Sequence, residues 1–499
     1  MPAAQISAEN TLPRRLRRIT AFLTVTAAVY LVLLIPDPEP APPKPAARKA
    51  FAWNQDQYWS ALESSYVAAR QFGCENLDSL IQQGIGQSVS LTNALHVAAY
   101  PAEDTLFDAI ERNIFTLAPM VAACPQYLHD YAAAITAMRT AVKEQSRNWD
   151  MQAQAVRDRL YRLLYGSRAA MEEVMLQASP ASLPPIVVCY DEPSATPSTE
   201  ILGVRVHSGD ILVSRGGAAT SAFIARGNDY PGNFSHVALV HVDSSGHASI
   251  IEAHIEKGVA VASIEEYLRD TKLRVMVLRF RADLLADSML PHKAAAFALR
   301  DAGTRRIPYD FKMNFHDSTE FFCSEVASSA YRHAGITLWM GLSSISTVGV
   351  SSWLAAFGVE HFETQEPADL EYDPQLRVVA EWRDPDVLFK DHIDNAVIDV
   401  MLEGAEKGER LDYDWYMLPV VRVVKAYSAI LNGFGGVGPV PEGMSSTAAL
   451  RNKRFTERHA RMTAFVLERV QQFEKELGYV PPYWELVRFA REAKSKADS

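Results

Sequence analysis

Three side chains in the middle of the chain, His236, Glu252 and Cys323, are of the types that together activate a thiol for attack on a carbonyl carbon. A cysteine nucleophile needs a base that takes its proton, and the base needs a group that holds it in place. A histidine and a carboxylate can supply these two functions. If the fold brings the three residues together, we expect acyl transfer through a covalent thioester.

Cys323 lies near the start of the stretch "DSTEFFCSEVASSAYRHAG", residues 317–335, which is predicted to be a helix. Apolar residues recur there at the spacing of one helix face, namely Cys323, Val326, Ala327, Ala330, Tyr331 and Ala334. We expect Ser318 or Thr319 to cap the start and Gly335 to end the helix. In a first turn, free N–H groups and the helix dipole lower the pKa of a thiol and can bind an oxyanion. A cysteine on a buried helix face is also an ordinary core residue, and its position alone does not decide between the two.

His236 and Glu252 belong to a series of short segments rich in Val and Ile, which are predicted to form strands. These segments cover residues 209–215, 236–242, 248–254, 258–264 and 274–280. Turn sequences such as "DSSG" and "EKG" separate them, which favours an antiparallel meander. A helix over residues 291–303 follows, and a last extended segment, residues 374–382, is expected to complete the sheet.

Glu252 lies in the middle of its strand between apolar neighbours, where an unpaired carboxylate is costly to bury. We therefore expect it to meet a cation or an imidazolium. His236 opens the preceding strand, where loop meets sheet, and neighbouring strands can bring the two residues together. His254, two residues after Glu252 on the same strand face, is the alternative orienting residue.

Five short motifs in this region resemble those of a known family. They are "SGDILVS" (208–214), "FSHVALV" (234–240), "IIEAH" (250–254), "IPYDF" (307–311) and "FFCSEV" (321–326). Their types and order are similar to those of the permuted papain-like hydrolases of the YiiX/YebB type, relatives of the NlpC peptidases. The resemblance covers roughly residues 200–385. It implies an α+β fold in which an antiparallel sheet packs against the helix that carries the nucleophile.

The resemblance also implies roles for single residues. Cys323 is then the nucleophile, His236 the base and Glu252 the residue that orients the imidazole, and Tyr309, Ser235 and His254 are candidates for lining the site. No cofactor is expected. A metal site is disfavoured because the histidines of the strands differ in face and no HExxH or CxxC motif is present.

The N-terminus predicts a membrane anchor. The basic cluster "RRLRR", residues 14–18, precedes an uncharged apolar run from Ile19 to Ile35, and no small-residue cleavage site follows. An uncleaved transmembrane anchor is favoured over a cleaved signal peptide. The bulk of the chain is then extracytoplasmic, in the periplasm of a bacterium and attached to the inner membrane by a single pass.

The rest of the chain divides by composition into a basic cytoplasmic segment (1–18), the anchor (19–35), a Pro/Ala-rich linker (36–50), a helical domain (51–180), the papain-like domain (200–385) and a helical C-terminal region (386–499). The net charge of −11 argues against nucleic acid as a partner. Cys74 and Cys124 are candidates for a disulfide, and two free buried thiols are the alternative. The amphipathic stretch "WYMLPVVRVVKAY", residues 415–427, can lie on a membrane or cover the body, and packing on the body is the commoner outcome.

The sequence therefore predicts a thiol-dependent hydrolase that cleaves an amide or peptide bond of a cell-envelope substrate, a cell-wall peptide in the first instance. One alternative is a lipase or acyltransferase that uses the same three residues on a lipid. The other is a non-catalytic envelope binding module in which Cys323 forms a disulfide with Cys189. The sequence does not indicate any protein partner.

Overall fold

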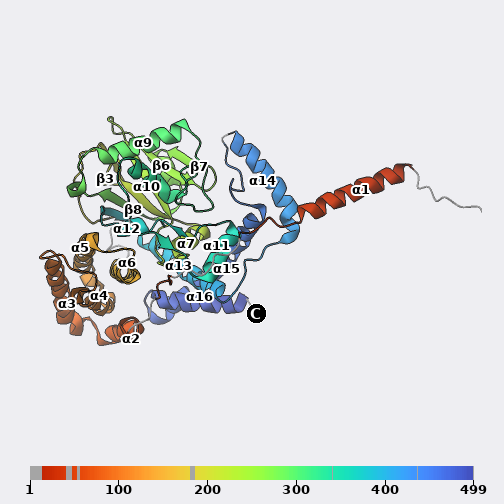
Figure 1. The fold of residues 1–499 in the computed structure, drawn as a ribbon. Coiled ribbons are helices and arrows are strands. Elements are labelled where there is room, and N and C mark those ends of the chain that lie inside the picture. Colours follow the sequence, from red (N-terminus) through yellow and green to blue (C-terminus); the bar gives the residue numbers. More distant parts are fainter. Residues whose placement is uncertain are drawn as a thin grey trace, which may run out of the picture.

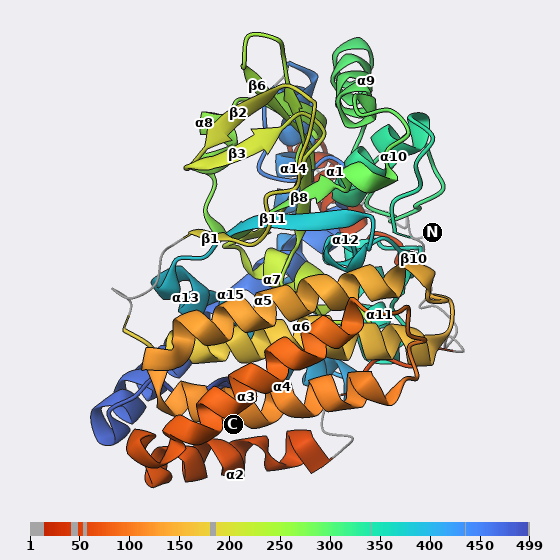
Figure 2. The same ribbon diagram turned by 90° about the vertical axis from the view of Figure 1, so that its left-hand side faces the viewer.

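The structure is a computed structural model that describes residues 14–40, 48–52, 57–179, 186–339, 341–434 and 436–497. Parts of the predicted cytoplasmic segment (1–18) and linker (36–50) lie outside these residues. A helical region forms one end of the molecule, a sheet with two covering helices forms the other, and C-terminal helices lie between and beside them (Figure 1; Figure 2).

The helical region agrees with the amphipathic pattern of residues 51–180. It consists of α2 (Gln57–Phe72), α3 (Cys74–Leu95), α4 (Thr105–Ala123), α5 (Leu128–Gln145) and α6 (Gln154–Leu176). Their apolar faces form one core, in which Ile81, Phe107, Ile114 and Ile135 are fully buried.

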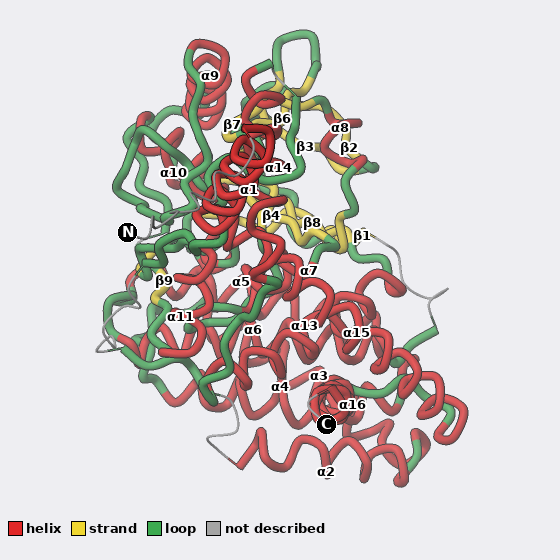
Figure 3. Tube along the Cα trace, turned by 90° about the vertical axis from the view of Figure 1, so that its right-hand side faces the viewer, coloured by secondary structure: helices red, strands yellow, loops and turns green. Residues whose placement is uncertain are grey.

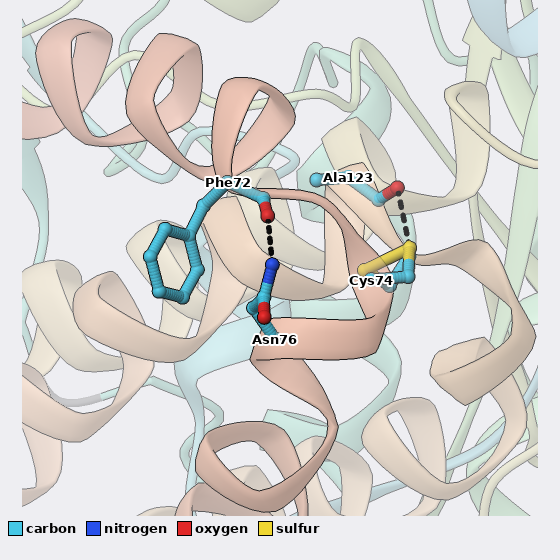
Figure 4. The surroundings of a disulfide bond; sticks show 5 residues. Phe72, Cys74, Asn76 and Ala123 are labelled. Carbon is cyan, nitrogen blue, oxygen red and sulfur yellow. Dashed lines mark hydrogen bonds between the residues drawn. A yellow bond between two sulfur atoms is a disulfide. The ribbon is translucent and has the colours of Figure 1, made fainter.

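A disulfide joins Cys74, the first residue of α3, to Cys124, which directly follows α4 (Figure 4). Beside it, the Asn76 amide donates a hydrogen bond of 2.7 Å to the carbonyl oxygen of Phe72 and so ties the end of α2 to the start of α3. The other two cysteines, Cys189 and Cys323, are free. The alternative in which those two form a disulfide is therefore wrong.

Seven strands form one antiparallel sheet in the order β1-β11-β8-β4-β5-β6-β7. Their bounds are β1 Ile186–Val188, β4 Ile211–Gly216, β5 His236–Val242, β6 Ala248–His254, β7 Gly258–Ala262, β8 Lys272–Phe280 and β11 Leu376–Trp382. From β4 to β7 the strands follow one another as the predicted meander. The next strand, β8, departs from it, because it returns to pair with β4 instead of β7.

The sheet is covered on both faces. Helices α9 (Leu290–Thr304) and α10 (Cys323–His333) pack on one face against the odd-numbered residues of β5, Val237 and Leu239. On the other face the even-numbered residues Ala238 and Val240 pack under the hairpin of β2 (Ser198–Ile201) and β3 (Val204–His207). This burial of both faces explains the continuous apolar sequence of β5.

The C-terminal region is helical, as predicted from residue 386 on. It contains α13 (Pro385–Glu406), α14 (Leu418–Gly433), α15 (Ser446–Leu477) and α16 (Tyr483–Ala497). Helices α13, α15 and α16 share a core with α7 (Ala219–Arg226) and α11 (Val348–Phe357) of the papain-like segment. Helix α14 stands apart from this core, and only Leu418, Pro419 and Ser428 of it are buried.

Buried ion pairs connect the three regions. Arg168 and Glu172 of α6 reach Glu381 of β11 and Arg274 of β8, at 2.8 and 2.6 Å, and Arg274 also reaches Asp391 of α13 at 2.5 Å. All five side chains are at most 2% exposed. Charges at this depth are tolerated only with such partners, so the helical regions and the sheet form one structural unit.

Helix α1 (Arg14–Leu33) projects from the body and touches it near α14 (Figure 1). Within the described part of the chain, no helix has the length and apolar character needed to cross a bilayer. The structure therefore does not confirm the predicted transmembrane anchor.

Candidate active site

Cys323 is the first residue of α10, as the helical pattern predicted. The helix starts later than expected, because Ser318 and Thr319 do not cap it. Instead the Glu325 carboxylate reaches back and accepts a hydrogen bond of 3.0 Å from the backbone N–H of Phe322. Thr319 is held in a separate turn, where its N–H donates to Asp317 at 2.8 Å.

The Cys323 side chain is buried, with 5% of the residue exposed. Its thiol donates to the carbonyl oxygen of Ser235 across 3.9 Å. Burial and the nearby carboxyl of Glu366 raise the pKa of the thiol to about 12, although the Ser324 hydroxyl and the backbone N–H of Val237 act in the opposite direction. The resting side chain is therefore a neutral thiol, and it needs a base to become a nucleophile.

His236 and Glu252 meet as predicted. They lie on the neighbouring strands β5 and β6, where Ala238 is opposite Glu252, and the His236 Nε2 lies 2.7 Å from one oxygen of Glu252. Glu252 is 1% exposed, which by itself would raise its pKa. The hydrogen bonds with His236 and His254 outweigh the effect of burial, so the pKa of Glu252 is lowered and it is an anion.

His254 also belongs to this cluster. Its Nε2 lies 3.0 Å from the second oxygen of Glu252, and its ring centroid is 6.1 Å from that of His236. The carboxylate thus has an imidazole at each oxygen. Glu252 contacts His236 directly, whereas His254, the alternative orienting residue, contacts Glu252 and not His236.

The structure brings Cys323 to the backbone on either side of His236 but not to its imidazole. The thiol touches Ser235 and Val237, and no hydrogen bond joins Sγ to a ring nitrogen of His236. Since Nε2 faces Glu252, Nδ1 is the ring nitrogen left to approach the thiol. His236 is an even-numbered residue of β5, whereas α10 packs against the odd-numbered ones, so the thiol and the imidazole start from opposite faces of the strand and must move toward each other to form a pair.

Tyr309 lies near Cys323 and also lines a cleft. The side chain is partly buried, and burial, together with the negative charge that Cys323 would have as a thiolate, raises the pKa of Tyr309 well above the ordinary value. Tyr309 also lines a cleft of about 440 Å³, together with Ile255, Phe311 and Lys312. Cys323 and His236 are not among the lining residues of this cleft.

The segment "IPYDF", residues 307–311, is fixed against the sheet by a close backbone approach. The N–H of Val259 donates to the carbonyl oxygen of Ile307 at 2.9 Å. Gly258 makes this possible, because its φ is +82° and a Cβ there would lie 2.1 Å from the same oxygen. The segment that contains Tyr309 is thereby held at the start of β7.

Glu366 was missed in the sequence. It is 4% exposed, and it belongs to the groups whose charge acts on Cys323 and on Tyr309. Burial and the neighbouring Asp369 raise the pKa of Glu366 to about 8. It lies in the loop sequence "TQEPADL", which has no periodicity, so only the fold shows that this carboxyl is close to the thiol.

Comparison with known proteins agrees with this arrangement. Residues 205–380 match the model of a family described as permuted papain-like amidase enzymes, YaeF/YiiX, C92 family. The matched range contains His236, Glu252, Tyr309 and Cys323. No curated protein and no solved structure matched the chain.

The family match and the mixed fold confirm the resemblance that the five motifs predicted. Helix α10, with Cys323 at its start, packs on the antiparallel sheet that carries His236 and Glu252. Residues 205–380 are therefore similar to the permuted papain-like amidases of the YaeF/YiiX type, and this indicates a cysteine hydrolase.

Proposed function

We propose that the protein is a thiol-dependent hydrolase that cleaves an amide or peptide bond of a cell-envelope substrate, with Cys323 as the nucleophile. The observation that carries the proposal is the position of the thiol at the first residue of α10, against the backbone that flanks His236. A thiol there lies at a helix start, where backbone N–H groups lack partners within the helix, and next to the strand whose first residue, His236, is held by the anionic carboxylate of Glu252.

The chemistry proceeds in two steps. His236 Nδ1 takes the thiol proton as Cys323 Sγ attacks the carbonyl carbon, and backbone N–H groups at the start of α10 stabilise the oxyanion. The imidazolium, stabilised by Glu252, returns its proton to the leaving amine, and a thioester remains on Cys323. Water, deprotonated by His236, then releases the acid and restores the thiol.

We also propose that the apolar N-terminal segment attaches the protein to the bacterial inner membrane and that the bulk of the chain is periplasmic. The exposed apolar side chains of α1 support attachment. The disulfide between Cys74 and Cys124 supports an oxidising compartment.

A lipid acyl group is the second candidate substrate. A specific observation favours it, since the segment that leads from α14 to α15 forms one wall of the cleft beside Tyr309 through Glu442 and Gly443. The preceding helix has an exposed apolar face, described below.

The test is the capture of an acyl-enzyme. The full chain is incubated with two electrophilic probe series, peptidyl acyloxymethyl ketones and long-chain acyl analogues, and the adduct is located by mass spectrometry. We expect labelling at Cys323 that Cys323→Ser abolishes and that the matched Cys189→Ser variant retains, with the peptidyl series reacting faster. Faster reaction of the acyl series favours the lipid substrate, and equal labelling of Cys323→Ser contradicts the proposal.

A further inference from the structure

Helix α14 turns its apolar face to the outside. Its exposed large side chains recur at steps of three and four residues, at Val420, Val423, Tyr427, Ile430 and Phe434. Val423 is 67% exposed and Ile430 60% exposed. This spacing places all five on one side of the helix, and the adjoining Trp415 and Tyr416 are exposed as well.

The two charged residues of the same helix have polar partners on neighbouring segments. Arg422 donates to the carbonyl oxygen of Val32 at 3.3 Å and lies 3.2 Å from the carboxylate of Asp37. Lys425 donates to the carbonyl oxygen of Met444 at 2.7 Å. A helix on the surface of a protein in water has its apolar side chains buried. The expectation that this stretch packs on the body is therefore met only in part, because Leu418 and Pro419 are buried and the larger apolar side chains that follow are exposed.

The apolar surface continues onto α1. The two helices touch, and Arg422 of α14 holds the carbonyl end of α1. Figure 3 shows both helices on the side of the molecule that faces the viewer. The exposed large apolar side chains there include Phe22, Leu23, Val25, Val29, Leu31, Val32 and Ile35.

We propose that α14, together with the adjoining apolar surface of α1, docks on a lipid bilayer, with α14 lying in the plane of the membrane interface. The reason is the chemistry of the surface. The exposed large side chains of α14 are aliphatic or aromatic, at Val420, Val423, Tyr427 and Ile430, and the exposed apolar side chains of α1 adjoin them. Aromatic and aliphatic side chains of this kind are typical of interfacial membrane helices.

Docking in this way has a consequence for the site. The chain after α14 supplies Glu442, Gly443 and Ser445 to the cleft beside Tyr309, and Gly443 packs directly against Phe311. The segment that follows a membrane-bound α14 therefore also lines the cleft. The inference goes beyond the proposed function and does not rest on it, because binding to lipid is measured without turnover.

The experiment places an environment-sensitive fluorophore on α14 in the full chain. Ile430→Cys is labelled with a nitrobenzoxadiazole group, and the protein is mixed with vesicles of phosphatidylethanolamine and phosphatidylglycerol. We expect the emission to shift to the blue and to rise by at least about threefold, and lipid-borne nitroxide to quench it. The matched control carries the same label at Val97→Cys, a position 81% exposed on the helical region, and stays unchanged.

A second variant keeps the labelled position and changes only the face around it. Val420→Asp with Val423→Asp places two charges on the exposed side and is expected to weaken the vesicle response by about tenfold or more. An equal response at residues 97 and 430 overturns the proposal. So does a response at residue 430 that appears without vesicles and grows with protein concentration, which identifies a second copy of the chain as the partner.

Discussion

The raised pKa of Cys323 predicts how its alkylation depends on pH. A thiol with a pKa of about 12 instead of the ordinary 9.0 is about a thousandfold less ionised near neutral pH, which corresponds to about 4 kcal/mol. Only the thiolate reacts with iodoacetamide. In the resting protein the rate of alkylation by iodoacetamide should therefore rise about tenfold for each pH unit between 7 and 10, without a plateau.

The assay uses Cys189→Ser, so that Cys323 is the only free thiol. Second-order rate constants for iodoacetamide are measured by mass spectrometry at each pH, with a small thiol in the same buffers as the reference. Restricted access to the buried thiol lowers every rate by the same factor and leaves the slope unchanged. A plateau between pH 6 and 8 would show that Cys323 and His236 form a thiolate–imidazolium pair at rest, and this reasoning would be refuted.

Three further variants test neighbouring features. Glu252→Gln should lower kcat about a hundredfold and His254→Gln only about tenfold, since Glu252 touches His236 directly and His254 acts through Glu252; equal losses in steady-state assays would contradict this order. The pKa of Glu366 is raised to about 8 from an ordinary 4.5, so the unfolded chain releases this proton first and the free energy of unfolding falls as the pH rises from about 5 to 8. Glu366→Gln should remove this fall, of about 2 to 4 kcal/mol in denaturant titrations, and an unchanged pH slope would argue against it. Replacing Cys74 and Cys124 by Ser opens a loop with a separation of 50 residues and should lower the free energy of unfolding by about 4 kcal/mol, whereas no change in the urea midpoint would mean that the disulfide does not constrain the chain.

The elements that position the site were predictable where the pattern is local. Strands β5 and β6 have the predicted bounds, because Val- and Ile-rich segments that lie between turn residues can be recognised as strands from the sequence alone. The pair of His236 and Glu252 followed from the cost of burying a lone carboxylate. The start of α10 was misplaced, because the carboxylate that caps it is that of Glu325 in its own first turn, and not Ser318 or Thr319 upstream.

Features that depend on tertiary contacts were not predictable. The pairing of β8 with β4 joins segments about 60 residues apart, and neither segment contains a sequence feature that indicates which strand it pairs with. Glu366 reaches the thiol only through the fold. The orientation of α14 was also not predictable, since its periodicity defines an apolar face but does not show whether that face contacts the body or stays exposed.

The buried ion pairs at the junction of α6, β8, β11 and α13 limit how this chain can be divided or recombined. The family match begins after Arg168 and Glu172 and ends before Asp391. A fragment cut at those limits would keep Arg274 in a strand without either carboxylate, and an uncompensated buried charge costs about 3 to 5 kcal/mol. The segment that matches the family model therefore depends on the flanking helices for the charges that compensate its buried arginine, and we expect it not to fold stably when it is cut out at those limits.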